Sequence, residues 1–205
     1  MSEKKFKRKT FNDIEKIAGK VLEKYNVLQY PAKHMKEIMD KENIIYSESE
    51  NFKDDINGVF FIKKEVKGIT VSREISPERK NFVIAHELGH HFLEHLESDE
   101  RIECAVSERV DYSKLSLKED ERKEQEANIF ASYFLLPKKL IVPYIKMSLR
   151  LIKSDKSGVF LLNEKSSKNR NWNSFSSLIT HRFKTSKTIN KWRLYNLGYV
   201  KLPEN

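Results

Sequence analysis

The sequence predicts an α+β fold, in which a small three-stranded sheet packs on a buried helix and a helical region follows at the C-terminal end. Three segments have strand-like sequences, at residues 44–47, 58–62 and 67–72. The last two should form a hairpin around residues 63–66. Residues 82–93 are instead apolar nearly all round, which indicates a helix that is buried on most sides.

Two short helices should precede the sheet. The first follows Asn12, a candidate N-cap, and the second spans residues 32–42. Apolar residues recur at helical spacing in both segments. They are Ile14, Ile17, Ala18, Val21, Leu22 and Tyr25 in the first helix, and Met35, Ile38 and Met39 in the second.

The buried helix carries the motif H-E-x-x-H, with His86 and His90 four residues apart. Ser76 suits its N-cap and Pro77 its first helical position. Residues four apart share one face of a helix, so both imidazoles can reach one metal ion, and Glu87 beside them can deprotonate a water on that metal. Unpaired polar groups are costly to bury, so a metal explains this set better than two core histidines bonded to backbone do.

Another helix is expected after the H-E-x-x-H helix, at residues 116–136. Its start, S-L-K-E at residues 116–119, has the pattern of a capping box, and Pro137 should end it. Residues 97–115 lie between the two helices and show no clear periodicity. They should therefore form a loop that crosses from one helix to the other.

The helix expected at residues 116–136 should supply a third metal ligand. Glu124 lies on a face with small residues, where another helix can pack closely, and Asn128 one turn later can orient a ligand. Glu124 is therefore the predicted ligand. Glu126 remains the alternative, because this part of the helix also carries solvated charges.

A competing motif overlaps the first. Residues 91–95 read H-x-x-E-H, the inverted zinc motif. His91 lies about 140° around the helix from His86, so one metal cannot use both motifs. We expect His91 and His95 to be partly exposed or to support the ligands.

Residues 84–91 (I-A-H-E-L-G-H-H), followed by E-x-x-A-N-x-F-A at 124–131 and L-L-P at 135–137, resemble the ImmA/IrrE family of zinc metallopeptidases. They also fit the wider gluzincin pattern, H-E-x-x-H then E-x-x-x-D, with Asn128 in place of Asp. The resemblance covers residues 12–137. It implies a zincin-like fold, Zn²⁺ bound by His86, His90 and Glu124, and Glu87 as the general base.

The length of 205 residues suits one well-packed domain with a small appendage. We expect a metallopeptidase domain at residues 1–150 and a basic helical region at residues 151–205. Cys104 is the single cysteine, so no internal disulfide can form, which fits a reducing compartment. No apolar run has transmembrane length and the basic start lacks the apolar stretch of a secretory signal, so we expect a cytoplasmic protein without a membrane partner.

The C-terminal quarter should be helical. A helix is expected at residues 138–151 with a break near Pro143, then a loop at 163–173 and two helices at 174–183 and 187–197, which Gly198 ends. This pair resembles a helix-turn-helix, a comparison that the ImmA/IrrE resemblance supports. Its expected core is Leu178, Ile179, Phe183, Ile189, Trp192, Leu194 and Leu197.

Nearly all the net charge lies in this quarter. The chain has 39 Lys and Arg against 30 Asp and Glu, a net charge of +9. From residue 151 onward it has 11 basic and 3 acidic residues, a net charge of +8. A basic helix pair can contact DNA phosphates or an acidic protein surface, and the alternative is a solvated basic face.

These features predict a cytoplasmic zinc endopeptidase. Glu87 would take a proton from the attacking water and pass it to the leaving amine. Candidates for stabilising the oxyanion are His95, Tyr133 and His181. The resemblance implies that the protein substrate is a helix-turn-helix repressor, whose cleavage at one site relieves repression.

Two other functions stay open. One is a non-catalytic regulator with a structural zinc, which binds DNA or protein through the basic region. Glu87 argues against it, because a structural site needs no base and usually has four protein ligands. The other is a component of a toxin–antitoxin pair.

Overall fold

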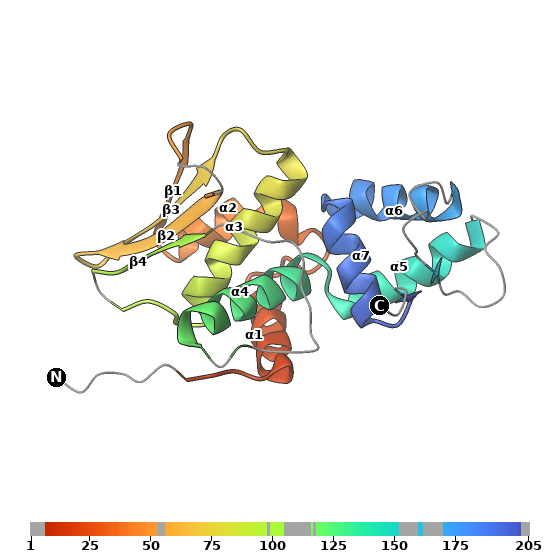
Figure 1. The fold of residues 1–205 in the computed structure, drawn as a ribbon, viewed down its shortest axis with the longest axis horizontal. Coiled ribbons are helices and arrows are strands. Elements are labelled where there is room, and N and C mark those ends of the chain that lie inside the picture. The colour runs from red at the N-terminus through yellow and green to blue at the C-terminus, as the bar shows by residue number, and fades with distance from the viewer. Residues whose placement is uncertain are drawn as a thin grey trace.

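The computed structural model describes residues 7–52, 56–97, 99–104, 116, 118–151, 160–161 and 170–201. A sheet and helices α1 to α4 form one part, and α5 to α7 lie together at the other end of the molecule (Figure 1). The first part contains α1 (Phe11–Lys24), α2 (Pro31–Lys41), β1 (Ile44–Ser49), β2 (Gly58–Lys63), β3 (Val66–Ser72), α3 (Pro77–Phe92), β4 (Arg101–Cys104) and α4 (Glu119–Leu135). The second contains α5 (Lys138–Leu151), β5 (Phe160–Leu161), α6 (Arg170–Phe183), α7 (Lys187–Asn196) and β6 (Val200–Lys201).

The first helix begins earlier than its predicted cap. Thr10, rather than Asn12, is the N-cap of α1. Its hydroxyl accepts a hydrogen bond from the Asp13 N–H (3.2 Å), and the Asp13 carboxylate accepts one from the Thr10 N–H (3.0 Å). This reciprocal capping box satisfies two N–H groups at the helix start, which a cap at Asn12 would not do.

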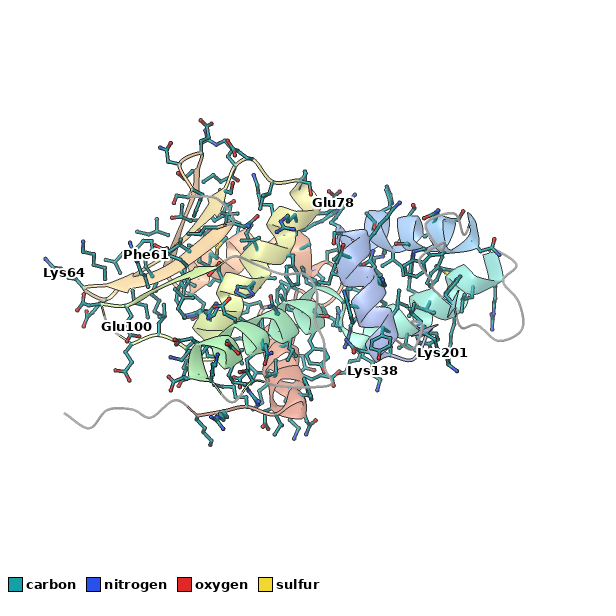
Figure 2. All side chains as sticks on the ribbon, in the orientation of Figure 1. Phe61, Lys64, Glu78, Glu100, Lys138 and Lys201 are labelled. Carbon is teal, nitrogen blue, oxygen red and sulfur yellow. The ribbon has the colours of Figure 1, made fainter. Side chains whose placement is uncertain are left out.

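The sheet has the strand order β1-β3-β2-β4. The predicted hairpin is confirmed: β2 and β3 are antiparallel, and Lys63 pairs with Val66. The two residues between them, Lys64 and Glu65, both have positive φ (47° and 67°), as a type I′ turn requires. Lys64 and Glu100 lie at the same end of the sheet (Figure 2), where the Lys64 N–H donates to the Asp99 carboxylate (3.1 Å).

A fourth strand corrects the expected three-stranded sheet. Residues Arg101–Cys104, predicted as part of a loop, form β4 and pair antiparallel with β2, Phe60 opposite Ile102. A charged segment of four residues is too short to show the alternation that marks a strand. The rest of that predicted loop, residues 105–115, lies outside the described residues.

Helix α3 begins as predicted. Ser76 caps it by accepting a hydrogen bond from the Arg79 N–H (3.3 Å), and Pro77 occupies the first turn. The sheet covers one side of α3 and α4 packs on another (Figure 1). The side chains buried around it come from all three layers. They include Phe60, Ile69 and Val71 of the sheet, Phe82, Val83 and Leu88 of α3, and Phe130 and Phe134 of α4.

The predicted capping box of α4 is wrong. The N-cap is Lys118, which makes no side-chain capping bond. The Ser116 hydroxyl instead accepts from the Lys118 N–H (3.1 Å) and donates to the Glu121 carboxylate (2.8 Å). Ser116 therefore lies before the helix rather than at its cap, while α4 does end just before Pro137, as expected.

The C-terminal helices differ from expectation at two places. Helix α5 continues through Pro143 to Leu151 without the expected break, because one proline removes one backbone hydrogen bond and does not by itself end a helix. Helix α6 begins at Arg170, inside the segment predicted as a loop, and residues 163–169 of that segment lie outside the described part. Helix α7 is capped by Ser186 and is followed by Gly198, whose φ of 78° suits a glycine.

The core of this second part is more aromatic than expected. Four of the predicted residues are buried, Ile179, Phe183, Ile189 and Leu194, whereas Leu178, Trp192 and Leu197 are only partly buried. Phe160, Trp172 and Phe175, which the sequence did not single out, make ring contacts with one another. Among the described helices, none combines the length and apolar character that a membrane crossing requires.

Arg193 of α7 joins the two parts. Its side chain is buried, its Nε donates to the Leu136 carbonyl at the end of α4 (3.1 Å), and its guanidinium lies over the Tyr133 ring, 4.4 Å from the centroid. Asn81 of α3 makes a second link, donating from Nδ2 to the Lys184 carbonyl (2.8 Å). The C-terminal helices are thereby tied to both α3 and α4.

We predict that Arg193→Ala lowers the free energy of unfolding by about 2–3 kcal/mol, because it removes a charged hydrogen bond and a cation–π contact from a buried position. Lys187→Ala, at an exposed position of the same helix, should change it by less than about 0.5 kcal/mol. Urea denaturation measures both. Equal stability of the Arg193→Ala variant and the parent chain would mean that this link contributes nothing to folding.

Candidate metal centre

Three predicted ligands converge between α3 and α4. His86 Nε2 lies 3.3 Å from Glu124 Oε2, and His90 Nε2 lies 3.3 Å from Glu124 Oε1. The two Nε2 atoms are 2.9 Å apart. One ligand atom from each of the three residues therefore lies within 4.8 Å of the others.

This triangle fits a zinc ion. Tetrahedral zinc with bonds of about 2.0–2.2 Å places its ligand atoms roughly 3.3–3.6 Å apart, close to the separations found here. Two imidazoles and one carboxylate also form the donor set of a catalytic zinc, which leaves the fourth position to water or substrate. Both histidines are fully buried, while the Glu124 side chain is 34% exposed, so the group opens towards solvent on the Glu124 side.

Gly89 lets the two helices approach closely enough for this. A Cβ added at Gly89 would lie 3.2 Å from the Cα and the carbonyl oxygen of Ala127, and 3.2 Å from the Phe130 ring. Backbone atoms cannot move aside as a flexible side chain does. The small residues Gly89 and Ala127 therefore bring the α4 backbone against the H-E-x-x-H helix, and Glu124 one turn earlier reaches the histidines.

Asn128 orients His86. The Asn128 Oδ1 atom lies 2.9 Å from His86 Nδ1. An amide oxygen only accepts, so His86 carries its hydrogen on Nδ1 and turns the lone pair of Nε2 towards His90 and Glu124. This is the supporting position expected for Asn128 from the sequence.

His90 has a longer chain of support. His90 Nδ1 lies 3.0 Å from His95 Nδ1, and His95 Nε2 lies 3.3 Å from Glu126 Oε2. The Glu126 carboxylate also accepts from Arg122 Nε (2.8 Å) and from the Lys9 N–H (2.9 Å). In this chain His90 Nδ1 donates to His95 Nδ1, and His95 Nε2 donates to the Glu126 carboxylate. The lone pair of His90 Nε2 is then left for the metal.

This network settles where the remaining motif residues lie. Glu126, the alternative third ligand, contacts His95 and lies outside the group formed by His86, His90 and Glu124. His95 is buried and supports His90, whereas His91 points elsewhere and contacts Glu42 (3.0 Å). His91 and His95, the two histidines of the inverted motif, therefore contact different partners. The helical geometry predicted that one metal cannot use both motifs, and the two histidines of the converging group are those of H-E-x-x-H.

Electrostatics favour metal binding by the histidines. Burial lowers the pKa of His90 to about 3, so its ring is neutral near pH 7 and can act as a ligand. Burial opposes the charged form of His86 as well, but the hydrogen bond and negative charge of Glu124 outweigh it and raise the pKa of His86. A metal cation between His86 and Glu124 would take the place of that proton.

Glu87 is fully buried beside the ligands, and the sheet makes room for it at Gly58. A Cβ added at Gly58 would collide with Glu87 Oε1 and approach a methyl group of Val83 to 2.6 Å. Gly58 opens β2 and pairs with Cys104 of β4. Gly58 was not among the predicted site residues, although a glycine in a strand often marks a close approach.

The three oxyanion candidates lie outside the His86–His90–Glu124 group. His95 is engaged by His90 and Glu126. Tyr133 lies under the guanidinium of Arg193, and His181 is exposed on α6.

This arrangement is typical of metallopeptidases: two histidines on an H-E-x-x-H helix, a glutamate from the next helix, and a second glutamate beside them. A family model described as Peptidase_M78, IrrE N-terminal-like domain, matches residues 43–154. The match spans more than half of the chain, and the protein belongs to this family. The resemblance to ImmA/IrrE proteins is thereby confirmed.

Solved structures give a second comparison. The fold is similar to that of a Mycobacterium tuberculosis transcriptional regulator, with a TM-score of 0.55 and 18% sequence identity over 88% of this chain. The similarity spans 46% of the length of that regulator. At this identity the comparison supports the α+β fold alone. Among curated proteins, no significant match is found.

We predict that Glu124→Ala weakens zinc binding by more than about 100-fold, because residues that only support ligands typically contribute 10–100-fold. Glu126→Ala should have the smaller effect, since it acts through His95. Competition with a zinc-responsive dye measures both affinities. Unchanged affinity in Glu124→Ala together with a large loss in Glu126→Ala would move the third ligand to residue 126.

We also predict that Gly58→Ala keeps zinc but lowers peptide hydrolysis by on the order of 100-fold, because the methyl group displaces the Glu87 carboxylate from its position. Gly19→Ala is the matched control, since a Cβ there meets nothing within 4 Å. Zinc content and the rate of cleavage are measured on both variants. Full activity of Gly58→Ala would show that the position of Glu87 does not depend on this contact.

Proposed function

We propose that the protein is a cytoplasmic zinc endopeptidase that cleaves a helix-turn-helix transcriptional repressor at a specific site and so relieves repression. The observation that supports this most is the convergence of His86, His90 and Glu124, with Glu87 buried beside them. Membership of a peptidase family agrees with it. Three protein ligands rather than four are the number that catalysis needs.

Each residue has a role in the proposed reaction. Zinc in this site would supply Lewis acidity, which activates water and polarises the scissile carbonyl. Glu87 accepts the proton of the attacking water and passes it to the leaving amine. Asn128 and His95 hold the rings of His86 and His90 in the orientation that binding requires.

We propose that the substrate binds along β4. Among the strands that the structure describes, the order makes β1 and β4 the edges of the sheet. Of these two, β4 is next to the catalytic glutamate, because its residue 104 pairs with Gly58, which contacts Glu87. An extended segment that adds to this edge through main-chain hydrogen bonds would carry its peptide groups past the site.

The basic C-terminal region would recruit the substrate. Its net charge of +8 suits an acidic protein surface, and its helices α6 and α7 are tied to α3 and α4 through Asn81 and Arg193. The same charge supports a second candidate function, a non-catalytic zinc-containing regulator or toxin–antitoxin component that binds DNA or protein. The similarity to a protein called a transcriptional regulator agrees with both candidates.

We predict that Glu87→Gln abolishes proteolysis while zinc and fold are retained. An amide is nearly isosteric with the carboxylate but cannot accept the proton, and a general base contributes on the order of 10²–10⁴-fold. The purified protein and the variant are incubated with the product of the adjacent gene, with zinc and with a chelator, and fragments are identified by mass spectrometry.

The outcomes separate the two candidate functions. Cleavage at one site that needs both zinc and Glu87 supports the endopeptidase. Binding of the repressor or of DNA without cleavage by the zinc-loaded protein would favour the non-catalytic regulator. Near-normal cleavage by Glu87→Gln would remove Glu87 from the mechanism.

A further inference from the structure

A groove of about 740 Å³ lies between α1 and the start of α5, apart from the metal centre. It includes neither a predicted ligand nor Glu87 among its lining residues. Its volume falls within the ~300–1,000 Å³ of typical binding clefts. The groove is bounded by α1, by Tyr133 near the end of α4, and by Pro137 to Pro143 around the first turns of α5.

The floor of the groove is apolar and its rim is basic. Leu22, Leu28, Tyr133, Pro137, Val142 and Pro143 supply the apolar lining. Lys16 and Lys20 stand one turn apart on α1, and Lys138 stands at the start of α5, where Figure 2 labels it. Within the described part of the chain, no acidic side chain forms an ion pair with any of these three lysines.

The two glutamates on the same rim are already engaged. Glu23 pairs with Lys139 (3.1 Å), and Glu15 lies 3.9 Å from the guanidinium of Arg193. Their charges are thereby partly balanced within the protein. The groove consequently presents an excess of positive charge around an apolar floor.

Gly19 adds an independent observation. It lies in the middle of α1, on the wall of the groove, where glycine costs about 1 kcal/mol relative to alanine. Neither packing nor backbone conformation requires a glycine there, because an added Cβ meets nothing within 4 Å and the residue is not among the glycines with positive φ. What its absence of side chain provides is clearance inside the groove.

We propose that this groove binds an acidic amphipathic helix of a partner protein. Two helices form its walls, so a third helix can lie between them with its apolar face on the floor, a common mode of peptide recognition. Acidic residues on both flanks of that helix would pair with Lys16 and Lys20 on one side and Lys138 on the other. The clearance at Gly19 admits the backbone or a bulky apolar anchor of the partner.

The proposal is tested with a fluorescein-labelled synthetic helix that carries Leu at i, i+3, i+4 and i+7 spacing and Glu on both flanks. Its counterpart has Lys in place of Glu, and dodecanoate represents a small apolar anion. Fluorescence anisotropy should show binding of the acidic helix, weakened by salt because exposed charges are screened. Gly19→Trp, which fills the groove, should weaken binding about tenfold or more, whereas Gly19→Ala should preserve it.

The charge is tested separately. Lys16→Glu/Lys20→Glu should also weaken binding about tenfold or more. The control Lys36→Glu/Lys187→Glu makes the same change in net charge at exposed positions of α2 and α7 and should leave binding unchanged. Thermal unfolding verifies that every variant is folded.

Three results would overturn the proposal: equal binding of the acidic and basic helices, no effect of Gly19→Trp, or binding of dodecanoate with neither helix bound. The groove is separate from the catalytic site, so binding of the acidic helix should persist in Glu87→Gln and after zinc is removed. A failure of proteolysis therefore leaves this test intact.

Discussion

The close contact between α3 and α4 at Gly89 and Ala127 is the constraint on which the metal centre depends. The H-E-x-x-H helix alone supplies two ligands, and the third comes from a helix 34 residues further along the chain, measured from His90 to Glu124. With a side chain at Gly89 the backbones would have to separate, since an added Cβ would lie 3.2 Å from backbone atoms of Ala127. Gly89 therefore contributes to the metal centre by allowing the two helices to pack closely, and not by binding the metal.

Burial of the ligands creates a second requirement, which the surrounding residues meet. A fully buried imidazole must have its second nitrogen satisfied, because an unpaired polar group in the interior is costly. His86 uses Asn128 for this, and His90 uses His95, which is in turn held by Glu126. The network continues to the start of α1, where the Lys9 N–H binds Glu126 and Arg122 binds the Lys9 carbonyl. The segment before α1 thus helps to fix a ring in α3.

The sequence could predict those parts of the site that depend on spacing within one helix. His86, Glu87 and His90 follow from the helical repeat, and Glu124 with Asn128 follows from the face that they share. Contacts between segments that are far apart in the sequence have no regular spacing by which they could be predicted. Gly58 against Glu87 could be found only in the folded chain, and so could the preference of Glu126 for His95. The same limit explains β4, whose four residues become a strand by pairing with β2, and the cap of α1, where Thr10 competes with Asn12 at the same helix start.

Helix α4 connects the metal centre to the groove beside α1 and to the C-terminal helices. Glu124 in its first half faces the histidines, and Tyr133 near its end packs under Arg193 and lines the groove beside α1. The two positions are nine residues apart in the sequence, which is roughly 13–14 Å along a helix axis. Arg193 also binds the carbonyl of Leu136, so α7 is anchored to the end of the same helix. One rigid element therefore fixes the positions of the third ligand, the groove and the basic C-terminal helices relative to one another. A partner held at the groove or on those helices would stand at a defined distance from the metal centre, which is the geometry that the proposed cleavage at a single site requires.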